Sequence, residues 1–541
     1  MNPDLVVCAD TVHTLTGDDR PVQAIAITGG VVTATGTRRD VRDWRGPRTE
    51  VVDLGDATVT PGLIDGHTHP VMGLQLTADV DLSAARSLDE VRHLLATAAA
   101  DRAPGEWLQA WGLDPNLFGD QPITSAPIAA AVGGRPAFVR LFDAHSALAT
   151  PAAMRIAGVD GPRRFAQRST VVCDENGQPT GLLLESAAMD LVAAHMPREP
   201  VAVRAARLRA LLGEMAATGL TGGHVMDLLG DSAEVVAAAE ELGELPLRLR
   251  FAPWCDPGVD ADGLAELIDV QGHGGRRWEI GGVKLFIDGT IDNGTAWLEE
   301  ADSHGESTDS FWTDPAAFSK AVRTLAAAGV PTATHAIGDA AVRYALEALD
   351  GLGRPAAASH RIEHIETLPT ELIDRFRRQG VVASMQPIHC HFTRADHSDN
   401  WSSRLGRERA DRAWRCRDLR DAGVPVVLGS DWPVAPFDPR RVLAAAQLRR
   451  PPGEPGVPPV QPRQGLTPLM ALEGYTRLAA AAAGRTGTIT AGAAADLTAF
   501  TLDPLRADPD ELADAPIALT VVAGTVVHRE PALAGYQSGH R

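Results

Sequence analysis

The feature that most constrains this chain is a His-x-His pair that directly follows an apolar, strand-forming stretch. His67 and His69 come immediately after residues 57–64 and a short Asp-Gly link. Side chains two residues apart in a strand point the same way, so both imidazoles can reach one point in space. Neutral imidazole is a good ligand for zinc. Because such pairs also occur by chance, this one predicts a metal site only if further ligands follow later strands.

Later in the chain, segments typical of strands alternate with segments typical of helices. Candidate strands end near eight positions, namely Ile64, Val225, Pro253, Ile287, His335, His364, Met385 and Ser430. Helix patterns cover 315–328, 340–349, 369–378 and 410–422, and a glycine closely follows each. This alternation predicts an α/β fold, a (β/α)8 TIM barrel. An open doubly wound sheet is the alternative, although no Gly-x-Gly-x-x-Gly motif follows an early strand.

The two ends of the chain have the pattern of short antiparallel strands. Residues 24–35 contain two such strands around a Gly-Gly pair, and residues 519–527 repeat the pattern near the C-terminus. We expect residues 1–58 and 485–541 to form one small composite β-sandwich domain. Two separate β appendages are the alternative.

The connection between the first and second candidate strands is far longer than a normal βα loop. Residues 75–199 contain a strand-like run at 136–141 and several helical runs. We expect an inserted subdomain over the mouth of the barrel, which leaves residues 59–74 and 200–484 for the barrel itself.

Polar side chains lie at the ends of five of the eight candidate strands, where the catalytic groups of such barrels sit. Besides the His-x-His pair they are Lys284, His335, His364 and Asp431. Each has a simpler explanation alone: His335 could be a core histidine, Asp431 a helix cap and Lys284 a buried ion-pair partner. Six metal-competent or modifiable groups at such strand ends instead predict one joint metal site.

With these motifs the chain resembles the amidohydrolase superfamily of metal-dependent hydrolases, in particular the amidohydrolase-3 branch with its YtcJ-like proteins and N-substituted formamide deformylases. The motifs are PGLIDGHTHP (61–70), DAHSALAT (143–150), GGVKLFIDGT (281–290), THAIGDAA (334–341), HRIEHIE (360–366), SMQP (384–387), LGSDWPV (428–434) and GTITAGAAADLTAF (487–500). They are specific for the family and much less so for a substrate. The chain departs from the family pattern at 290–294 and 386–392, and both segments should face the substrate.

The resemblance implies a binuclear centre of two divalent metal ions, for which Zn²⁺ is the expected metal. His67 and His69 would bind the more buried ion, and His335 and His364 the other. Lys284 would carry a carbamate that bridges both ions. Asp431 would bind the first ion and handle the proton. The implied catalytic residues are therefore Asp431, Lys284 and His335.

The implied activity is hydrolysis of a non-peptide amide or N-substituted formamide C–N bond of a small molecule by a metal-bridging hydroxide. One alternative is a cyclic amidase, a deaminase or a non-hydrolytic lyase on the same scaffold. Another is a metal-binding regulator without turnover. Lys284 argues against a mononuclear deaminase, and an intact Asp431 argues against a scaffold without turnover.

Six further residues are expected to contact the substrate: His145, His224, Trp111, Gln386, His389 and Trp432. For His224 a structural hydrogen bond is the alternative, for His389 a place in a polar loop, and for Trp111 the insertion's own core. We expect an apolar aryl or alkyl group of the substrate to lie between the insertion and residues 386–392.

Composition limits the partners and the compartment. A formal net charge of -20 argues against a nucleic-acid or anionic-membrane surface. Five scattered cysteines without a Cys-x-x-Cys pair favour a reducing compartment. No signal peptide and no apolar stretch of transmembrane length are evident. We therefore expect a cytoplasmic enzyme with a small-molecule substrate, no nucleic-acid or membrane partner, and a homodimer as one option.

Overall fold

Eight parallel strands form the centre of the fold within the residues that the computed structural model describes, 2–18, 20–119, 121–353 and 358–531. They are β7 (Leu63–Thr68), β14 (Leu220–Val225), β15 (Arg248–Phe251), β17 (Val283–Phe286), β18 (Thr332–Ala336), β19 (Arg361–His364), β20 (Val382–Met385) and β21 (Val426–Leu428). Nearly all of their side chains are buried. This is expected for parallel strands that are covered on both faces.

The strands belong to two hydrogen-bonded groups whose order follows the chain. One group runs β16-β15-β14-β7, where β16 is Trp278–Ile280, and the other runs β17-β18-β19-β20-β21. Backbone hydrogen bonds join the groups at both sides. The Lys284 N–H donates to Pro253 O (2.9 Å), and the Asp431 N–H donates to His67 O (2.7 Å). A doubly wound sheet reverses its strand order at a switch point, and the described strands show no such reversal.

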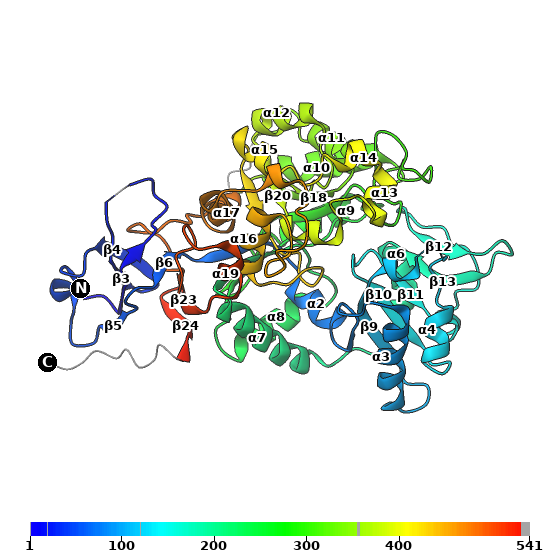
Figure 1. Ribbon diagram of the computed structural model, residues 1–541, viewed down its shortest axis with the longest axis horizontal. Coiled ribbons are helices and arrows are strands. Elements are labelled where there is room, and N and C mark those ends of the chain that lie inside the picture. The colour runs from blue at the N-terminus through cyan, green and yellow to red at the C-terminus, as the bar shows by residue number, and fades with distance from the viewer. Residues whose placement is uncertain (1, 19, 120, 354–357, 532–541) are drawn as a thin grey trace.

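Helices follow the strands and lie around them (Figure 1). Three of the predicted helices have ends within one residue of the prediction: α10 (Pro315–Ala327), α11 (Asp339–Ala348) and α12 (Thr370–Gln379). The other main helices of this part are α2 (Pro70–Leu76), α7 (Val201–Ala217), α8 (Ser232–Glu241), α9 (Ala261–Asp269), α13 (Asn400–Leu405), α16 (Pro439–Leu448), α17 (Pro468–Tyr475) and α18 (Arg477–Ala482). No helix among the described residues has the length and apolar character needed to cross a membrane.

The prediction of one helix over 410–422 is wrong. The segment contains the end of α14 (Arg407–Ala410) and the whole of α15 (Cys416–Asp421). Between them Ala413 forms a β-bridge with Thr367, and Trp414 has a positive φ of 41°. The bridge and this backbone conformation are both incompatible with a continuous helix.

Both ends of the chain contribute strands to one β region at the left of Figure 1. One sheet has the order β4-β3-β1-β5, and the other has the order β2-β6-β22-β23-β24. The strands are β1 (Leu5–Cys8), β2 (Thr11–Val12), β3 (Ala24–Thr28), β4 (Val31–Gly36), β5 (Glu50–Asp53), β6 (Thr58–Pro61), β22 (Leu497–Phe500), β23 (Ile517–Val522) and β24 (Thr525–Arg529). Leu5, Ile25 and Val59 share one buried cluster with Leu497 and Leu519, so the two ends are packed together.

The segment between β7 and β14 forms a separate layer at the right of Figure 1, with a sheet of order β12-β13-β11-β10-β9-β8. Its strands are β8 (Val80–Asp81), β9 (Leu108–Leu113), β10 (Ala137–Leu141), β11 (Ser146–Ala149), β12 (Thr170–Cys173) and β13 (Pro179–Leu184). Its helices are α3 (Leu88–Ala100), α4 (Ala126–Ala131), α5 (Pro151–Ile156) and α6 (Ser186–Ala193). Two apolar clusters belong to this segment alone.

Candidate metal centre

Three donor atoms converge beyond the carboxyl ends of β7 and β21. The Nε2 atoms of His67 and His69 lie 3.4 and 3.2 Å from the same oxygen, Oδ1 of Asp431. All three side chains are buried, and one donor atom from each lies within 4.8 Å of the others. Imidazole nitrogen and carboxylate oxygen are donor types that zinc binds. The trio therefore fits a divalent metal ion.

The other oxygen of Asp431 faces two more imidazoles. His364 Nδ1 and His389 Nε2 each lie 3.9 Å from Asp431 Oδ2 and form a second donor trio with it. The His335 ring packs on His364, with ring centroids 4.5 Å apart. Burial holds the pKa of His335 and of His364 well below the usual range. Both imidazoles are therefore neutral, which is the form that binds metal.

Two of these side chains belong to residues whose backbone lies in the left-handed region. The φ angle is 74° at His364 and 58° at Asp431. A non-glycine residue in this conformation costs of order 1–3 kcal/mol, and such residues cluster at functional sites. The backbone at these two strand ends therefore favours the placement of a side chain over local stability.

A carboxylate holds the other ring nitrogen of each β7 histidine. Nδ1 of His67 lies 2.6 Å from Oε2 of Glu363, and Nδ1 of His69 lies 2.7 Å from Oδ2 of Asp227. A proton on Nδ1 is shared with the carboxylate in each pair, and this directs Nε2 toward Asp431. Carboxylate–histidine pairs of this kind orient the ligands in many metal sites.

Sequence reasoning missed Glu363 and Asp227. The available signal was an acidic residue next to a strand-end histidine: Glu363 precedes His364, and Asp227 follows His224 by three residues. Both side chains are buried, with exposed fractions of 0%. An acid that a strand carries into the interior needs a partner, and that need was the missed argument.

Lys284 lies on β17 beside this cluster, with its side chain 1% exposed. Its Nζ lies 4.9 Å from the centroid of the Phe286 ring. Burial lowers the pKa of Lys284 to about 8, although Glu363 and Asp431 favour its charged form. A buried lysine with a lowered pKa has a larger neutral fraction, and only the neutral amine is nucleophilic.

A cavity of about 480 Å³ extends over the cluster, and all six predicted metal-site residues line it. Side chains of the segment between β7 and β14 form much of its wall, among them Gln109, Arg140 and Met189. Its apolar surface includes Met72, Leu76, Trp254, Phe286 and Phe311. The size and the mixed lining are typical of small-molecule sites.

Two of the six predicted substrate contacts lie beside the cluster. His145 lines the large cavity, and its Nδ1 lies 2.8 Å from Oε2 of Glu185. Burial alone would lower the pKa of His145, but Glu185 raises it to about 9. His389 lines a smaller adjoining cavity of about 50 Å³.

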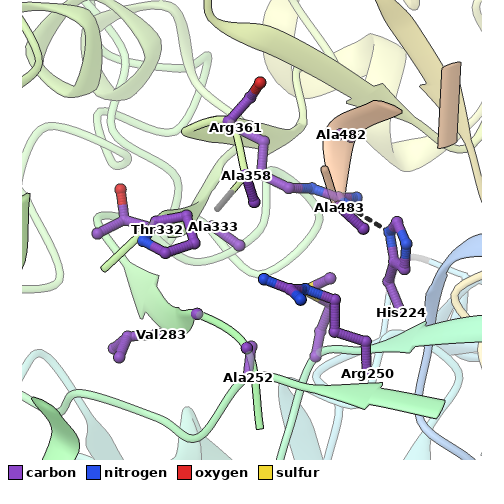
Figure 2. Close-up of a pocket in the computed structure, with 15 residues that line it drawn as sticks. His224, Arg250, Ala252, Val283, Thr332, Ala333, Ala358, Arg361, Ala482 and Ala483 are labelled. Carbon is purple, nitrogen blue, oxygen red and sulfur yellow. Dashed lines mark hydrogen bonds between the residues drawn. The ribbon is translucent and has the colours of Figure 1, made fainter. Parts of the chain in front are cut away.

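His224 lines a different cavity, which Figure 2 shows. Its Nδ1 accepts a hydrogen bond from Nη1 of Arg361 (2.8 Å), drawn there as a dashed line. The same cavity is lined by the first residues of β17, β18 and β19, Val283, Thr332 and Arg361. It lies at the opposite end of these strands from the metal cluster, so the structure corrects the placement of His224 and favours its structural hydrogen bond.

Trp111, Trp432 and Gln386 also lie elsewhere than predicted. Trp111 is 4% exposed within β9 and belongs to the interior of the inserted segment. The Trp432 ring packs closely over Gly73 and contacts Phe437. Gln386 is fully buried, and its amide atoms have no hydrogen-bond partner among the described residues. A sequence shows that an aromatic residue is near a site, but not which face of its strand or loop it occupies.

Comparisons with known proteins agree with a metal-dependent hydrolase. A model of the amidohydrolase family matches residues 50–528. YtcJ of Bacillus subtilis, which is named as an amidohydrolase, is 28% identical over 532 residues, covering 96% of this chain and 98% of YtcJ. The N-substituted formamide deformylase of Arthrobacter pascens is 26% identical over 541 residues, covering 97% and 98%. A metal-dependent hydrolase from Pyrococcus horikoshii OT3 shares the fold, with a TM-score of 0.72, 22% identity and coverage of 93% and 99%.

Proposed function

Because the chain belongs to the amidohydrolase family, as its motifs predicted, we propose that it hydrolyses a carbon–nitrogen bond of a small molecule. The bond is that of a non-peptide amide or an N-substituted formamide, and the reaction takes place at a centre of two divalent metal ions. The similarity to the formamide deformylase of Arthrobacter pascens supports this bond type.

One observation carries the proposal. Nε2 of His67 and Nε2 of His69 converge on Oδ1 of Asp431, while Glu363 and Asp227 hold the opposite ring nitrogens. A structural histidine does not need both of its nitrogens directed in this way. A ligand histidine does.

In this proposal each of the six predicted residues has a role. His67, His69 and Asp431 hold one ion; His335 and His364 hold the other; and Lys284, as a carbamate, is shared by both. Zinc fits this set of imidazole and carboxylate donors. When bound, the ions supply Lewis acidity toward a carbonyl oxygen and activate water.

Lys284 and Asp431 perform the chemistry that belongs to the chain itself. The neutral Lys284 amine adds to CO2 and loses a proton, which converts a cation into an anionic oxygen ligand. Burial alone would raise the pKa of Asp431, but the imidazoles of His67 and His69 hold it well below its usual range. Asp431 is therefore ionised and accepts a proton from the attacking water. Because it is a weak base, it passes that proton readily to the departing nitrogen.

We further propose a closed (β/α)8 barrel, because sequential strands and hydrogen bonds at Lys284 and Asp431 favour closure. The shared apolar cluster of the two chain ends favours one composite β-sandwich of residues 1–58 and 485–541. The remaining boundaries are 59–74 with 200–484 for the barrel and 75–199 for the insertion.

The test is metal analysis of the purified protein together with a panel of amides, such as N-benzylformamide, acetanilide and a cyclic amide. We expect two equivalents of divalent metal, amine release from the open-chain amides, and loss of turnover after chelation with recovery on adding Zn²⁺. Amine release that is unaffected by removal of all metal would contradict the proposal. So would a preference for the cyclic amide.

A further inference from the structure

A small chamber adjoins the metal centre on the side of His335 and His364. Its volume is about 50 Å³, and it shares six lining residues with the large cavity: Asp143, His145, His335, His364, Asp431 and Val434. Its other wall is aromatic. Phe142 packs on Phe392 with ring centroids 4.5 Å apart, and Trp401 stacks on Trp414 at 4.9 Å.

Two carboxylates of this chamber have no cationic partner. Glu366 accepts a hydrogen bond from Trp401 Nε1 (2.6 Å), and Asp292 accepts one from Asn400 Nδ2 (3.1 Å). Neither has a lysine or arginine within ion-pair distance in the part of the chain that the structure describes. Burial raises the pKa of Asp292 to about 7 despite the Asn400 hydrogen bond. Carboxylates removed from water without a counter-ion are costly, and a bound cation would remove that cost.

His389 provides independent evidence for an occupant. Its side chain is 6% exposed and lines the chamber, yet Nε2 has no hydrogen-bond partner among the described residues. The ring also hydrogen-bonds to the Ser430 backbone, so the nitrogen that donates there is Nδ1. Nε2 therefore carries a free lone pair in the interior. A buried acceptor of this kind requires a donor.

These acceptors lie in the segments where the chain differs from the family pattern. Asp292 belongs to residues 290–294, and His389 belongs to residues 386–392. The chamber has one candidate cation of its own, His145, and that imidazole is already paired with Glu185. The donor that the chamber lacks must therefore come from a ligand.

We propose that this chamber binds a primary ammonium group of the substrate, which makes the substrate class an aminoalkyl amide or formamide. An ammonium has three N–H donors and no acceptor, which complements Glu366, Asp292 and His389. Its positive charge is also favourable beside the faces of Phe142 and Trp401. The volume admits a short aminoalkyl arm and excludes a second ring. The inference rests on the proposed function, because the same molecule must place its carbonyl at the metal centre.

The experiment measures binding and turnover separately on the metal-loaded enzyme. Binding of n-propylammonium is compared with binding of 1-propanol by calorimetry and by tryptophan fluorescence, since Trp401 and Trp414 line the chamber. The variants are Asp292→Asn and Glu366→Gln. The control is Asp339→Asn, another buried carboxylate, which accepts from the Glu299 N–H (2.9 Å) outside both cavities.

We expect n-propylammonium to bind at least about tenfold more tightly than 1-propanol, a difference of about 1.4 kcal/mol. Each chamber variant should remove that difference, and the control should keep it. The kcat/KM of N-(3-aminopropyl)formamide should likewise exceed that of N-butylformamide, and the ratio should fall toward one in both variants. Melting curves establish that the variants are folded, and Asp292→Asn alone suffices if Glu366→Gln does not fold.

Equal binding of the ammonium and the alcohol by the unaltered enzyme would overturn the proposal. Loss of one metal equivalent from Asp292→Asn would also overturn it, because the chamber would then hold a metal ion. Ammonium binding that depends on Asp292, without cleavage of any amide, would support the chamber and count against the proposed function. Cleavage of amides with no ammonium preference would do the reverse.

Discussion

Nδ1 of His67 lies 2.6 Å from Oε2 of Glu363, and the guanidinium of Arg361 holds the same carboxylate from its other side. Burial alone would raise the pKa of Glu363, but Arg361 and His67 hold it well below its usual range. Arg361 also donates to the Gly66 carbonyl (2.6 Å), one residue before His67. The position of the His67 ring is therefore fixed through both its side chain and its backbone.

This relationship predicts the effect of Glu363→Gln. The glutamine has the same shape but loses the charge that orients His67, so metal affinity should fall by about 10–100-fold. Competition with a fluorescent zinc chelator measures the change. Glu473→Gln is a matched control, since Glu473 pairs with Arg477 on α17 and α18. Equal zinc affinity in the Glu363 and Glu473 variants would remove Glu363 from the centre.

The second prediction uses an unusual feature of the composition: the chain has two lysines, Lys284 and Lys320. Lys284→Ala should lose most bound metal and nearly all activity, and small carboxylic acids should partly restore both by replacing the carbamate. Incubation with ¹³C-bicarbonate should give a carbamate signal in ¹³C spectra that is absent from Lys284→Ala. Lys320 is exposed on α10, so Lys320→Ala should keep the signal, the metal and the activity. Two firmly bound ions in Lys284→Ala would exclude the bridging role.

Much of the fold could be predicted from local pattern because the information is local. Apolar runs followed by a polar strand-end residue located β17, β18 and β19, and glycines located the ends of α10 and α12. The helix predicted over 410–422 failed because a bridge between Ala413 and Thr367, distant in sequence, interrupts it.

The candidate site divides in the same way. The predicted metal-site residues lie together because strand ends of one parallel arrangement meet at one edge. Glu363 and Asp227 were missed, and His224 and Trp111 were misplaced, because the inward face of a residue depends on strand register and packing. Neither quantity can be obtained from one chain's local pattern.

Metal binding should depend on pH through His69. Burial alone would lower the pKa of His69, but hydrogen bonds to Asp227 and Asp431 raise it to about 9. Below that pH the ion must displace a proton, so zinc affinity should rise with pH, roughly tenfold per unit, until about pH 9. Asp227→Asn should weaken the dependence because the His69 pKa falls. The measurement is zinc titration from about pH 6 upward, and a flat profile would show that His69 does not bind the ion.

Asp431→Asn should keep the fold and lower turnover by about 10²–10⁴-fold. The amide cannot accept the proton from the attacking water, although its oxygen can still face His67 and His69. Metal content should fall less than turnover, and kcat should fall more than KM changes. Stopped assays with metal analysis on the same samples separate the two effects. A variant with near-normal kcat would show that Asp431 does not carry the proton.

The last prediction concerns the wall of the large cavity. The sequence directed attention to Trp111, but the structure has Met189 of α6 lining the cavity, while Trp111 lies inside the insertion. Met189→Trp adds volume next to the metal centre, so it should raise KM for bulky aryl amides by about tenfold or more and leave small formamides nearly unaffected. Trp111→Phe is the matched control. It changes an interior aromatic residue of the same segment, and it should lower the melting temperature without changing the order of substrates. If Trp111→Phe reorders the substrates and Met189→Trp does not, the selective surface lies on the β9 side of the insertion rather than on α6.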